Sequence, residues 1–478
     1  MTDQPLGSRA FTLEDQLAFA RLSLDWNPMH LDANFARRTQ AGAPLVHGIH
    51  NLLWTMDTVL RSFAFDIRNI KARFQQPLFP GEVARIEIRS RTATAVNIEV
   101  VAGSTVVAAI RLSSEPGKLA GSSARPIALT PQKIAAPVDI PFEQMANQAG
   151  AVAAGGDDEI RKLFPALSDA IGVASVHGLL AASQIVGMAC PGLHSLFAGL
   201  DLSRDPESCG ERALRYAVHK TDARFRSLQI DVAGSGLAGR LDAFARPAPP
   251  VQAAMSAVSA RVASNAFAGQ SALIIGGSRG LGEVTAKILA AGGGYPVITY
   301  RDGRREAEAV AAGIRDAGGR CDVVRYDALE PAGSLDGIRA VDFCYYFATA
   351  KILQRKSALY EPEILRSFLS YYADGFYDLC VALAQNRERR IGVFYPSTVL
   401  IDEEVSGAAE YAMAKSAGEA LANYINAFLP QVQVISRRLP RILTDQTATV
   451  GVASTRDALD VMLPIVYEVQ QGAAAIEP

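Results

Sequence analysis

The chain has 478 residues, of which 49% are hydrophobic and 20% charged, with a formal net charge of −2 at pH 7. This length exceeds what one ordinary core requires, so we expect two or three domains. The balanced charge gives no reason to expect nucleic acid or an anionic membrane as a partner. The five cysteines show no CxxC spacing, which argues against a disulfide framework or a zinc site and fits a reducing cytoplasm.

Two segments bear on membrane attachment. The N-terminal stretch MTDQPLGSRAFTLEDQ has no apolar core of the kind found in a signal peptide. Residues 170–200 contain no Asp, Glu, Lys or Arg, but polar residues, glycines and a proline leave no continuous run of about 18 apolar residues. We therefore expect a helix that is buried on all sides inside a domain rather than a membrane span.

An internal repeat organises the first half of the chain. Val-His-Gly followed by a long apolar run occurs at His47 and again at His177, 130 residues later. Gly-Glu followed by alternating apolar and polar residues occurs at Gly81 and again at Gly210, 129 residues later. A long helix followed by half-exposed antiparallel strands, found twice, predicts a pair of hotdog units whose sheets wrap their central helices.

The proline cluster ARPAPP ends the first half and is followed by an expected linker at residues 251–268. The sequence thus predicts an α+β double hotdog, with a catalytic unit at 1–125 and a degenerate unit at 126–250. Residues 269–478 are predicted to form an α/β Rossmann-type domain with a doubly wound parallel sheet.

The stretch ARLSLDWNPMHLDANFA places Asp25 and His30 five residues apart, with Asn27-Pro28 between them. Because the proline breaks any helix, both side chains can converge on one water molecule. Gly48 would open the following long helix, where a free N–H and the helix dipole can stabilise an oxyanion. Addition of water to a 2-enoyl thioester needs an acid, a base and such a donor.

With the Val-His-Gly that follows, this stretch resembles the signature of the MaoC-like (R)-specific enoyl-thioester hydratases and dehydratases. The resemblance implies that Asp25 and His30 are the acid/base pair, that Gly48 is the oxyanion donor, and that Asn27 supports the site and binds substrate. His47 is expected to be structural, and Leu24 stands where the family commonly has glycine. The alternative is a helix cap at Asp25 and a surface histidine at His30.

The second repeat carries Val-His-Gly but no Asn-Pro-His segment before it. We expect it to cover one side of an acyl pocket without catalysing. A relic pair formed by Asp169 and His177 is the alternative.

A glycine-rich turn, GGSRGLG, joins the strand-like Ser271–Ile275 to the helix-like EVTAKILAAG. In that position the backbone can approach a pyrophosphate at a helix N-terminus. The spacing resembles that of the short-chain dehydrogenase/reductases. The cofactor-binding positions that this resemblance implies are Gly276, Ser278, Arg279, Gly280, Leu281, Gly282, Tyr300, Arg301, Asp327 as the adenine contact, Ala348 and Thr444.

The choice of cofactor depends on the end of the second strand, where an acidic residue marks NAD. Here Tyr300 and Arg301 occupy that place, and Asp302 comes one residue later. Further guanidinium groups stand nearby, at Arg279, Arg304 and Arg305. Guanidinium groups match a 2′-phosphate, so we expect NADPH rather than NADH; a solvated arginine-rich face is the alternative.

Tyr411 and Lys415 lie one helical turn apart, on the same face of a helix. The ammonium is expected to lower the pKa of the phenol, and Ser397 to hold a substrate carbonyl. The order of glycine loop, Ser, Tyr and Lys resembles the same reductase family, against the alternative of a surface Tyr–Lys pair. Two departures, residues 347–350 in place of Asn-Ala-Gly and Tyr372 or a neighbour in place of a helix asparagine, imply a changed proton relay.

The two halves share an intermediate. A ketoreductase makes a 3-hydroxyacyl thioester, and a hydratase interconverts it with the 2-enoyl thioester. The sequence predicts a bifunctional, cytoplasmic, homo-oligomeric enzyme without a metal, which performs NADPH-dependent 3-oxoacyl reduction and (R)-specific dehydration or hydration on acyl-CoA or acyl carrier protein thioesters. Peroxisomal multifunctional enzymes, which the chain resembles piecewise, pair the same activities. The alternatives are a ketoreductase with a non-catalytic acyl-binding half and a scaffold that presents acyl carriers.

Overall fold

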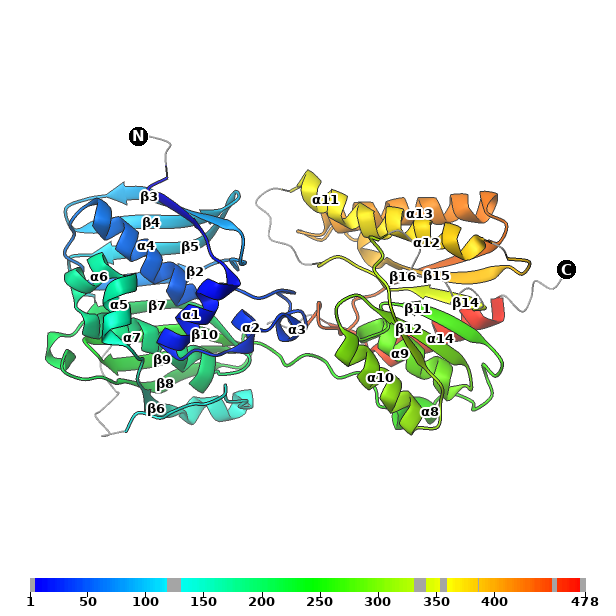
Figure 1. The fold of residues 1–478 in the computed structure, drawn as a ribbon, viewed down its shortest axis with the longest axis horizontal. Coiled ribbons are helices and arrows are strands. Elements are labelled where there is room, and N and C mark those ends of the chain that lie inside the picture. The colour runs from blue at the N-terminus through cyan, green and yellow to red at the C-terminus, as the bar shows by residue number, and fades with distance from the viewer. Residues whose placement is uncertain are drawn as a thin grey trace. The chain divides into compact units, whose positions relative to one another are not determined.

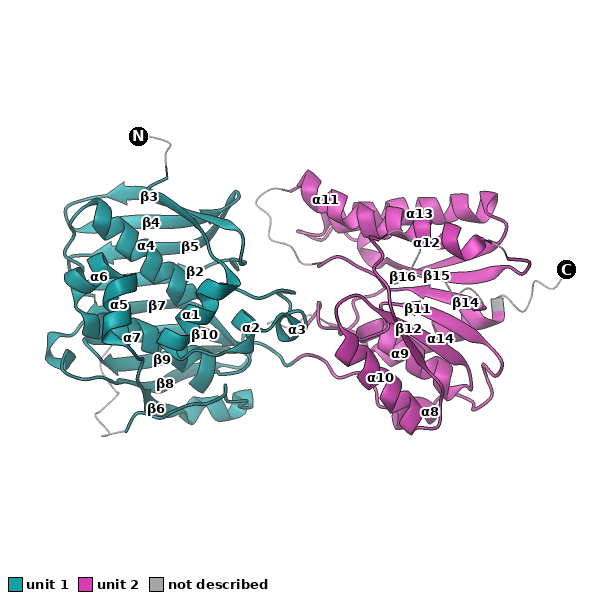
Figure 2. Cartoon of the chain, viewed as in Figure 1, with its two compact units in different colours: residues 1–248, 449–452 teal, residues 249–448, 453–478 magenta. Residues whose placement is uncertain are grey.

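The computed structural model describes residues 5–117, 130–330, 341–352, 359–385, 387–448 and 454–472. The chain divides into two compact units, the first built from residues 1–248 and the second mainly from residues 249–448 and the C-terminal helix (Figure 2). The expected boundary between residues 125 and 126 lies outside the described residues.

The segment expected to be a linker belongs to the second unit. It contains helix α8 (Met255–Ser259), and Val258, Val262 and Phe267 are buried in the core of that unit. Lys287 Nζ also donates a hydrogen bond to the Ala253 carbonyl at 2.9 Å. The expectation of a free linker at 251–268 is therefore wrong, because apolar side chains at helical spacing anchor the segment.

Unit 1 is built on one antiparallel sheet with the strand order β1-β3-β4-β5-β2-β7-β10-β9-β8-β6. Its strands are β1 (Gly7–Ala10), β2 (Asn69–Phe74), β3 (Val83–Arg91), β4 (Ala95–Ala102), β5 (Thr105–Ser113), β6 (Ala149–Val152), β7 (Ser195–Arg204), β8 (Leu214–Asp222), β9 (Ser227–Gly234) and β10 (Leu237–Ala245). Read from its two edges, the sheet gives equivalent orders, β1-β3-β4-β5-β2 and β6-β8-β9-β10-β7. The central pair, β2 and β7, joins the halves, so the repeat in the sequence becomes two equivalent halves of one sheet.

Two long helices, α4 (Gly48–Ser62) and α7 (Val173–Gln184), pack against this sheet and contact each other in one core (Figure 1). Helix α4 buries an apolar stripe with helical spacing, formed by Ile49, Leu52, Leu53, Met56 and Val59. Helix α7 is buried on nearly every side and continues into a π-helical turn at Ile185–Ala189. The shorter helices are α1 (Leu13–Ser23), α2 (Pro28–Leu31), α3 (Ala33–Ala36), α5 (Asp157–Leu163) and α6 (Pro165–Ile171).

Within the described ranges, no single helix is both long and apolar enough to cross a membrane. Helix α6 and the continuous helix Val173–Ala189 meet the length and composition test only as a pair, and they are bent by 110°.

Unit 2 is a parallel sheet with the order β13-β12-β11-β14-β15-β16, which is the doubly wound Rossmann arrangement that the sequence predicts. Its strands are β11 (Ser271–Ile275), β12 (Tyr295–Tyr300), β13 (Asp322–Arg325), β14 (Phe343–Tyr346), β15 (Ile391–Thr398) and β16 (Val432–Leu439). Its longer helices are α9 (Gly280–Ala291), α10 (Arg304–Asp316), α11 (Pro362–Leu369), α12 (Gly375–Ala384), α13 (Ala409–Phe428) and α14 (Ala458–Gly472).

Helices cover both faces of this second sheet. Ala272 and Ile274 of β11 belong to the core that holds α9, α10 and α14, while Leu273 and Ile275 belong to the core that holds α11 to α13. Neighbouring residues of a strand point to opposite faces, so β11 is buried on both sides. The chain leaves β11 toward β12 and returns to β14 on the other side, and the carboxyl ends of such strands form the usual ligand crevice.

Candidate functional sites

Asp25 is buried between the two halves of unit 1. Its Oδ2 accepts a hydrogen bond from Ser183 Oγ of α7 at 2.7 Å, and its Oδ1 accepts one from the backbone N–H of Asn27 at 3.3 Å. Burial raises the pKa of Asp25, while nearby His30 and the Ser183 hydroxyl act in the opposite direction. Leu24, which ends α1 just before it, has a φ of +59°, a conformation that favours glycine.

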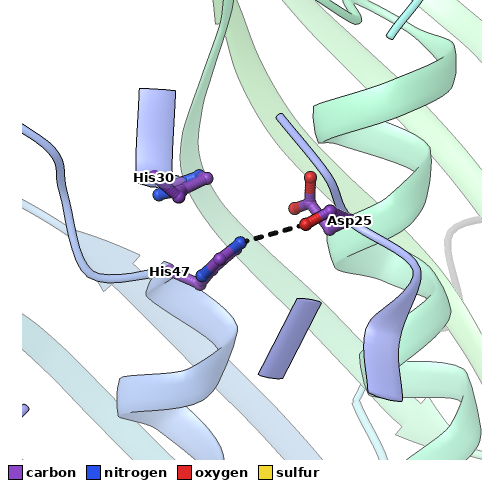
Figure 3. A group of neighbouring side chains, drawn as sticks. All are labelled: Asp25, His30 and His47. Atoms are coloured by element: carbon purple, nitrogen blue, oxygen red, sulfur yellow. Dashed lines mark hydrogen bonds between the residues drawn. The ribbon is translucent and has the colours of Figure 1, made fainter. Parts of the chain in front are cut away.

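His30 lies on α2 beside Asp25 (Figure 3). Its Nδ1 is 2.8 Å from the Leu45 carbonyl oxygen, an acceptor, so Nδ1 carries the proton in the neutral ring and Nε2 is left free to accept one. Burial lowers the pKa of His30, although the charge of Asp25 opposes this. A carboxyl whose pKa is raised and an imidazole whose pKa is lowered therefore stand side by side, so their proton affinities are brought closer together, as suits a proton-transferring pair.

His47 caps α4 and is bound on two sides. Its Nδ1 is 2.9 Å from Gln16 Oε1, its Nε2 is 3.3 Å from the Asp25 carbonyl oxygen, and its ring stacks on His30 at 3.8 Å between centroids (Figure 3). Single ligand atoms of Asp25, His30 and His47 lie within 4.8 Å of one another, close enough to suit a metal ion. The two imidazoles are only 24° from parallel, so their in-plane lone pairs do not converge on one point as ligation demands.

The polar atoms of the Asn27 amide bind groups within unit 1. Its Oδ1 accepts a hydrogen bond from the Met29 N–H, and its Nδ2 donates to the carbonyls of Gly187 and Gly192 at 2.8 and 3.0 Å. These bonds favour the expected supporting role, since the amide ties the Asp25 loop to the second half, and the substrate contact of Asn27 stays a prediction.

Gly187 allows the second half of unit 1 to approach the carboxylate of Asp25. A Cβ at this position would lie 2.1 Å from Asp25 Oδ1, so only glycine leaves room for the carboxylate. The π-helical turn that contains it changes the helical period and brings the Gly187 carbonyl to Asn27.

Gly48 is the first residue of α4, as the sequence predicts. Its N–H donates to no residue in the described part of the chain, and it stands at the positive end of the helix dipole. A Cβ on Gly48 would come 3.1 Å from the Phe74 ring. The position suits an oxyanion donor approached closely by a ligand.

The second repeat has no equivalent site. Gly178 lies inside α7, which begins at Val173, so its N–H is taken up within the helix. The suggested relic pair is also wrong: Asp169 is exposed, and His177 Nε2 instead lies 2.6 Å from Asp157, which Arg212 also binds.

The predicted cofactor positions of unit 2 meet at the carboxyl ends of its strands. Gly276 and Gly280 have φ values of +80° and +58°, and a Cβ on Gly282 would lie 2.3 Å from the Gly276 carbonyl oxygen. Added Cβ atoms on Gly276 and Gly280 would touch Phe347 and Thr444 respectively, which brings Ala348 and Thr444 to the loop. Ser278 and Leu281 lie in the same turn into α9, and Asp327 follows β13.

The loop thus forms a cradle of backbone at the N-terminus of α9, as a nucleotide pyrophosphate requires. Two of the four arginines expected near a 2′-phosphate, Arg279 and Arg301, already have protein partners. Arg301, which follows Tyr300 at the end of β12, binds Asp302 at 2.7 Å and the Tyr371 hydroxyl at 2.6 Å. Arg279 binds Asp445 at 3.0 Å.

Tyr411 and Lys415 both lie on α13, where Tyr411 is half-buried and Lys415 is buried. Burial raises the pKa of Tyr411 to about 12 and lowers the pKa of Lys415 to about 7. Lys415 Nζ donates to the Pro396 carbonyl at 2.6 Å and lies 5.9 Å from the Tyr411 ring centroid. The expectation that Lys415 lowers the pKa of Tyr411 is wrong for this structure, because the amine is turned to the backbone and burial of the phenol dominates.

Ser397 and Thr398 end β15 and differ in what they face. Arg438 and, more weakly, the Ser397 hydroxyl lower the pKa of Glu419, and Ser397 Oγ is buried without hydrogen-bond geometry to any residue that the structure describes. The Thr398 hydroxyl acts on Tyr411, whose pKa it lowers against the larger effect of burial. The arrangement favours Thr398 over the expected Ser397 as the hydroxyl beside the phenol.

Tyr372 is the residue expected in place of the helix asparagine of the short-chain dehydrogenase/reductases. It lies in a π-helical turn, Ser370–Asp374, and its hydroxyl bonds to that of Thr349. The ring stands 3.9 Å from Lys415 Nζ and is edge-on to Tyr411, with 5.7 Å between ring centroids. The ring of Tyr372 therefore packs against both Lys415 and Tyr411, and Thr349 holds its hydroxyl.

Ser183, Gly187 and Thr398 are the site residues that sequence reasoning missed. Ser183 and Gly187 stand 158 and 162 residues after Asp25, and no local pattern marks either. Thr398 is adjacent to the residue that was expected, so a one-residue shift in the same strand end would have found it.

Replacement of Gly187 by alanine tests the close approach of the two halves. Overpacking a buried site typically costs 1–3 kcal/mol, so G187A should lower the apparent Tm by about 3–10 °C. The matched control is G313A, on an interior turn of α10, where an added Cβ meets nothing within 4 Å. That variant should leave the Tm unchanged or raise it. Equal Tm values for G187A and the unmutated chain would contradict the packing.

Known proteins match each part of the chain separately. Residues 3–110 match the family described as MaoC like domain. Peroxisomal multifunctional enzyme type 2 of Drosophila melanogaster is 34% identical over 94 residues, which is 19% of this chain and 16% of that protein. The Mus musculus protein of that name is 36% identical over 84 residues, 17% of this chain and 11% of its own. The chain thus spans less than a fifth of the length of these two relatives.

An uncharacterized oxidoreductase of Methylorubrum extorquens is 27% identical over 199 residues, 39% of this chain and 79% of that protein. Among solved structures, a short-chain dehydrogenase/reductase from Serratia marcescens covers 44% of this chain and 94% of its own at 21% identity, with a TM-score of 0.39. A short chain dehydrogenase from Burkholderia cenocepacia in complex with NADP covers 45% and 95% at 22% identity and a TM-score of 0.39. Residues 3–110, with Asp25, His30 and Gly48 among them, therefore form a MaoC-like domain.

Proposed function

We propose that the chain is a bifunctional enzyme of 3-hydroxyacyl-thioester metabolism, which hydrates or dehydrates the acyl chain in unit 1 and reduces 3-oxoacyl thioesters in unit 2. The observation that carries the first activity is the meeting of Asp25, the free Nε2 of His30 and the free N–H of Gly48. In this proposal the two halves of the unit 1 sheet are two hotdog units, of which the second is catalytically degenerate.

The first reaction needs one water molecule. Asp25 and His30 hold it and take one of its protons as the oxygen adds to C3 of the 2-enoyl thioester. The charge that develops on the thioester oxygen is stabilised by the Gly48 N–H. The pair then returns a proton to C2, so the net change is the addition of water, and dehydration follows the same steps in reverse.

The second reaction places the carbonyl of a 3-oxoacyl thioester between Tyr411 and Thr398. A bound nicotinamide cofactor, NADPH rather than NADH in this proposal, would supply the hydride, and the glycine loop at 276–282 would hold it. Because burial raises its pKa to about 12, Tyr411 is protonated at neutral pH and can donate its proton to the carbonyl oxygen as the carbonyl is reduced. Thr398 would hold that oxygen by a hydrogen bond.

The relatives support this pairing, since curated proteins similar to part of the chain are named multifunctional enzymes and hydratase-dehydrogenase-epimerases. The substrate would be an acyl-CoA or an acyl carrier protein thioester. The second candidate is a ketoreductase whose first unit binds the acyl chain without catalysing. The hydrogen bonds that hold the buried Asp25 carboxyl speak against it.

Two assays on the full chain test the proposal. Crotonyl-CoA should lose its enoyl absorbance, and acetoacetyl-CoA should oxidise NADPH faster than NADH. General acid–base groups contribute 10²–10⁴-fold, so D25N should lower hydration by at least about 100-fold while sparing reduction. Y411F should do the reverse. Reduction without any hydration would support the binding-only first unit.

Replacement of Ser183 by alanine tests the link between the two halves in solution. Asp25 acts as a base only when ionised, so hydration should fall as the pH drops through its pKa, which burial raises. The Ser183 hydroxyl stabilises the carboxylate, so S183A should move this acid limb of the kcat/KM profile to higher pH. The matched control is S175A on the same helix, where the serine bonds to the Gly236 carbonyl instead. An acid limb at the same pH in both variants would contradict the link.

Substitutions at the end of β15 separate the two candidate hydroxyls. Removal of one donor to a reacting oxygen typically costs 10²–10³-fold, so T398V should lower kcat for acetoacetyl-CoA by about 100-fold. S397A should change kcat by less than about tenfold. The reverse ranking of kcat would return the role to Ser397.

A further inference from the structure

Arg246 is a buried cation that the two proposed reactions do not use. It follows β10 and is 9% exposed, and burial lowers its pKa to about 10. Its Nε donates to the Ser195 carbonyl at 3.2 Å and its Nη2 to the Leu193 carbonyl at 3.5 Å. No described carboxylate lies within ion-pair distance, and Nη1 has no hydrogen-bond partner among the described residues.

The guanidinium stands close to the acid/base pair. The Leu193 carbonyl that it binds also accepts a hydrogen bond from Asn27 Nδ2 at 3.4 Å, so a single residue separates Arg246 from the loop that carries Asp25 and His30. Arg246 is also near enough to help burial lower the pKa of His30.

The groups beside Arg246 in the described structure supply no counter-charge: burial and the neighbouring arginines lower the pKa of His194, so its ring is neutral. His194, whose Nδ1 is buried without a hydrogen-bond partner in the described structure, and Arg226 lie on the same side. The carboxylate nearest to His194 in the described structure, Asp139, is 3.7 Å from it and largely exposed. A buried charge without a counter-charge is costly, so the arrangement is completed by an anion from outside the protein.

We propose that Arg246, with His194 beside it, receives a carboxylate carried by the acyl chain of the thioester substrate. This rests on the proposed hydration site in unit 1. The other anion that a thioester substrate carries is the phosphate of its pantetheine arm, which is many bonds away from the reacting carbons. Arg246 is too close to His30 to suit that phosphate, whereas a carboxylate a few carbons beyond the double bond would reach it. The substrate class is then a short enoyl thioester with a terminal carboxylate.

Binding of two saturated thioesters to the full chain, measured by calorimetry, tests this without turnover. Glutaryl-CoA and valeryl-CoA have the same chain length and the same phosphates and differ in the terminal carboxylate. Hydrogen bonds to charged groups contribute about 1.5–3 kcal/mol, so R246Q should raise the Kd of glutaryl-CoA on the order of tenfold to 100-fold. The Kd of valeryl-CoA should change by less than about threefold. R246K, which keeps the charge, should recover part of the difference.

The matched control is R68Q, which removes an exposed arginine that pairs with Asp66 and should leave both Kd values unchanged. Equal weakening of both thioesters by R246Q would overturn the proposal and make Arg246 an anchor of the 193–195 loop or a phosphate ligand. Unchanged binding of glutaryl-CoA would overturn it as well. If neither crotonyl-CoA nor glutaconyl-CoA, which carries the terminal carboxylate, is hydrated while the Arg246-dependent preference persists, the hydration proposal fails and the carboxylate site stands.

Discussion

The buried carboxylate of Asp25 is the constraint on which unit 1 depends. An ionised carboxyl inside a protein is unfavourable unless hydrogen bonds replace the lost water. The chain meets this requirement from two places far apart in sequence: the Asn27 N–H beside it and the Ser183 hydroxyl of α7. Gly187 leaves the space, and Asn27 fastens the loop to the same helix. Residues of the second repeat thus support Asp25, which belongs to the first.

The same balance between burial and charge takes a different form in unit 2. Lys415 is enclosed by the rings of Tyr372 and Tyr395 and held by one carbonyl, and burial brings its pKa to about 7. Burial also keeps Tyr411 protonated. A protonated phenol is ready to give up a proton as a carbonyl is reduced. Packing around the site therefore sets the protonation of both groups before any substrate binds.

The sequence predicts the features that depend on local patterns. Alternation predicts half-exposed antiparallel strands in the first half of the chain, Gly48 opens its helix as expected, and the glycine loop joins β11 to α9. The features it misses depend on tertiary contacts. Ser183 meets Asp25 across 158 residues, and the choice between Ser397 and Thr398 depends on which face each presents. The pKa directions of Tyr411 and Lys415 follow from burial, which spacing along a helix does not reveal.

The central claim is that both sites act on one shared intermediate, and a single coupled assay tests it most directly. Crotonyl-CoA and NADP⁺ are given to the full chain at alkaline pH, without other enzymes, and NADPH absorbance is followed. We expect NADPH formation that is lost in D25N and lost separately in Y411F, because hydration must precede oxidation of the resulting alcohol. Hydration of crotonyl-CoA without any NADPH, from a chain that reduces acetoacetyl-CoA, would contradict the shared intermediate.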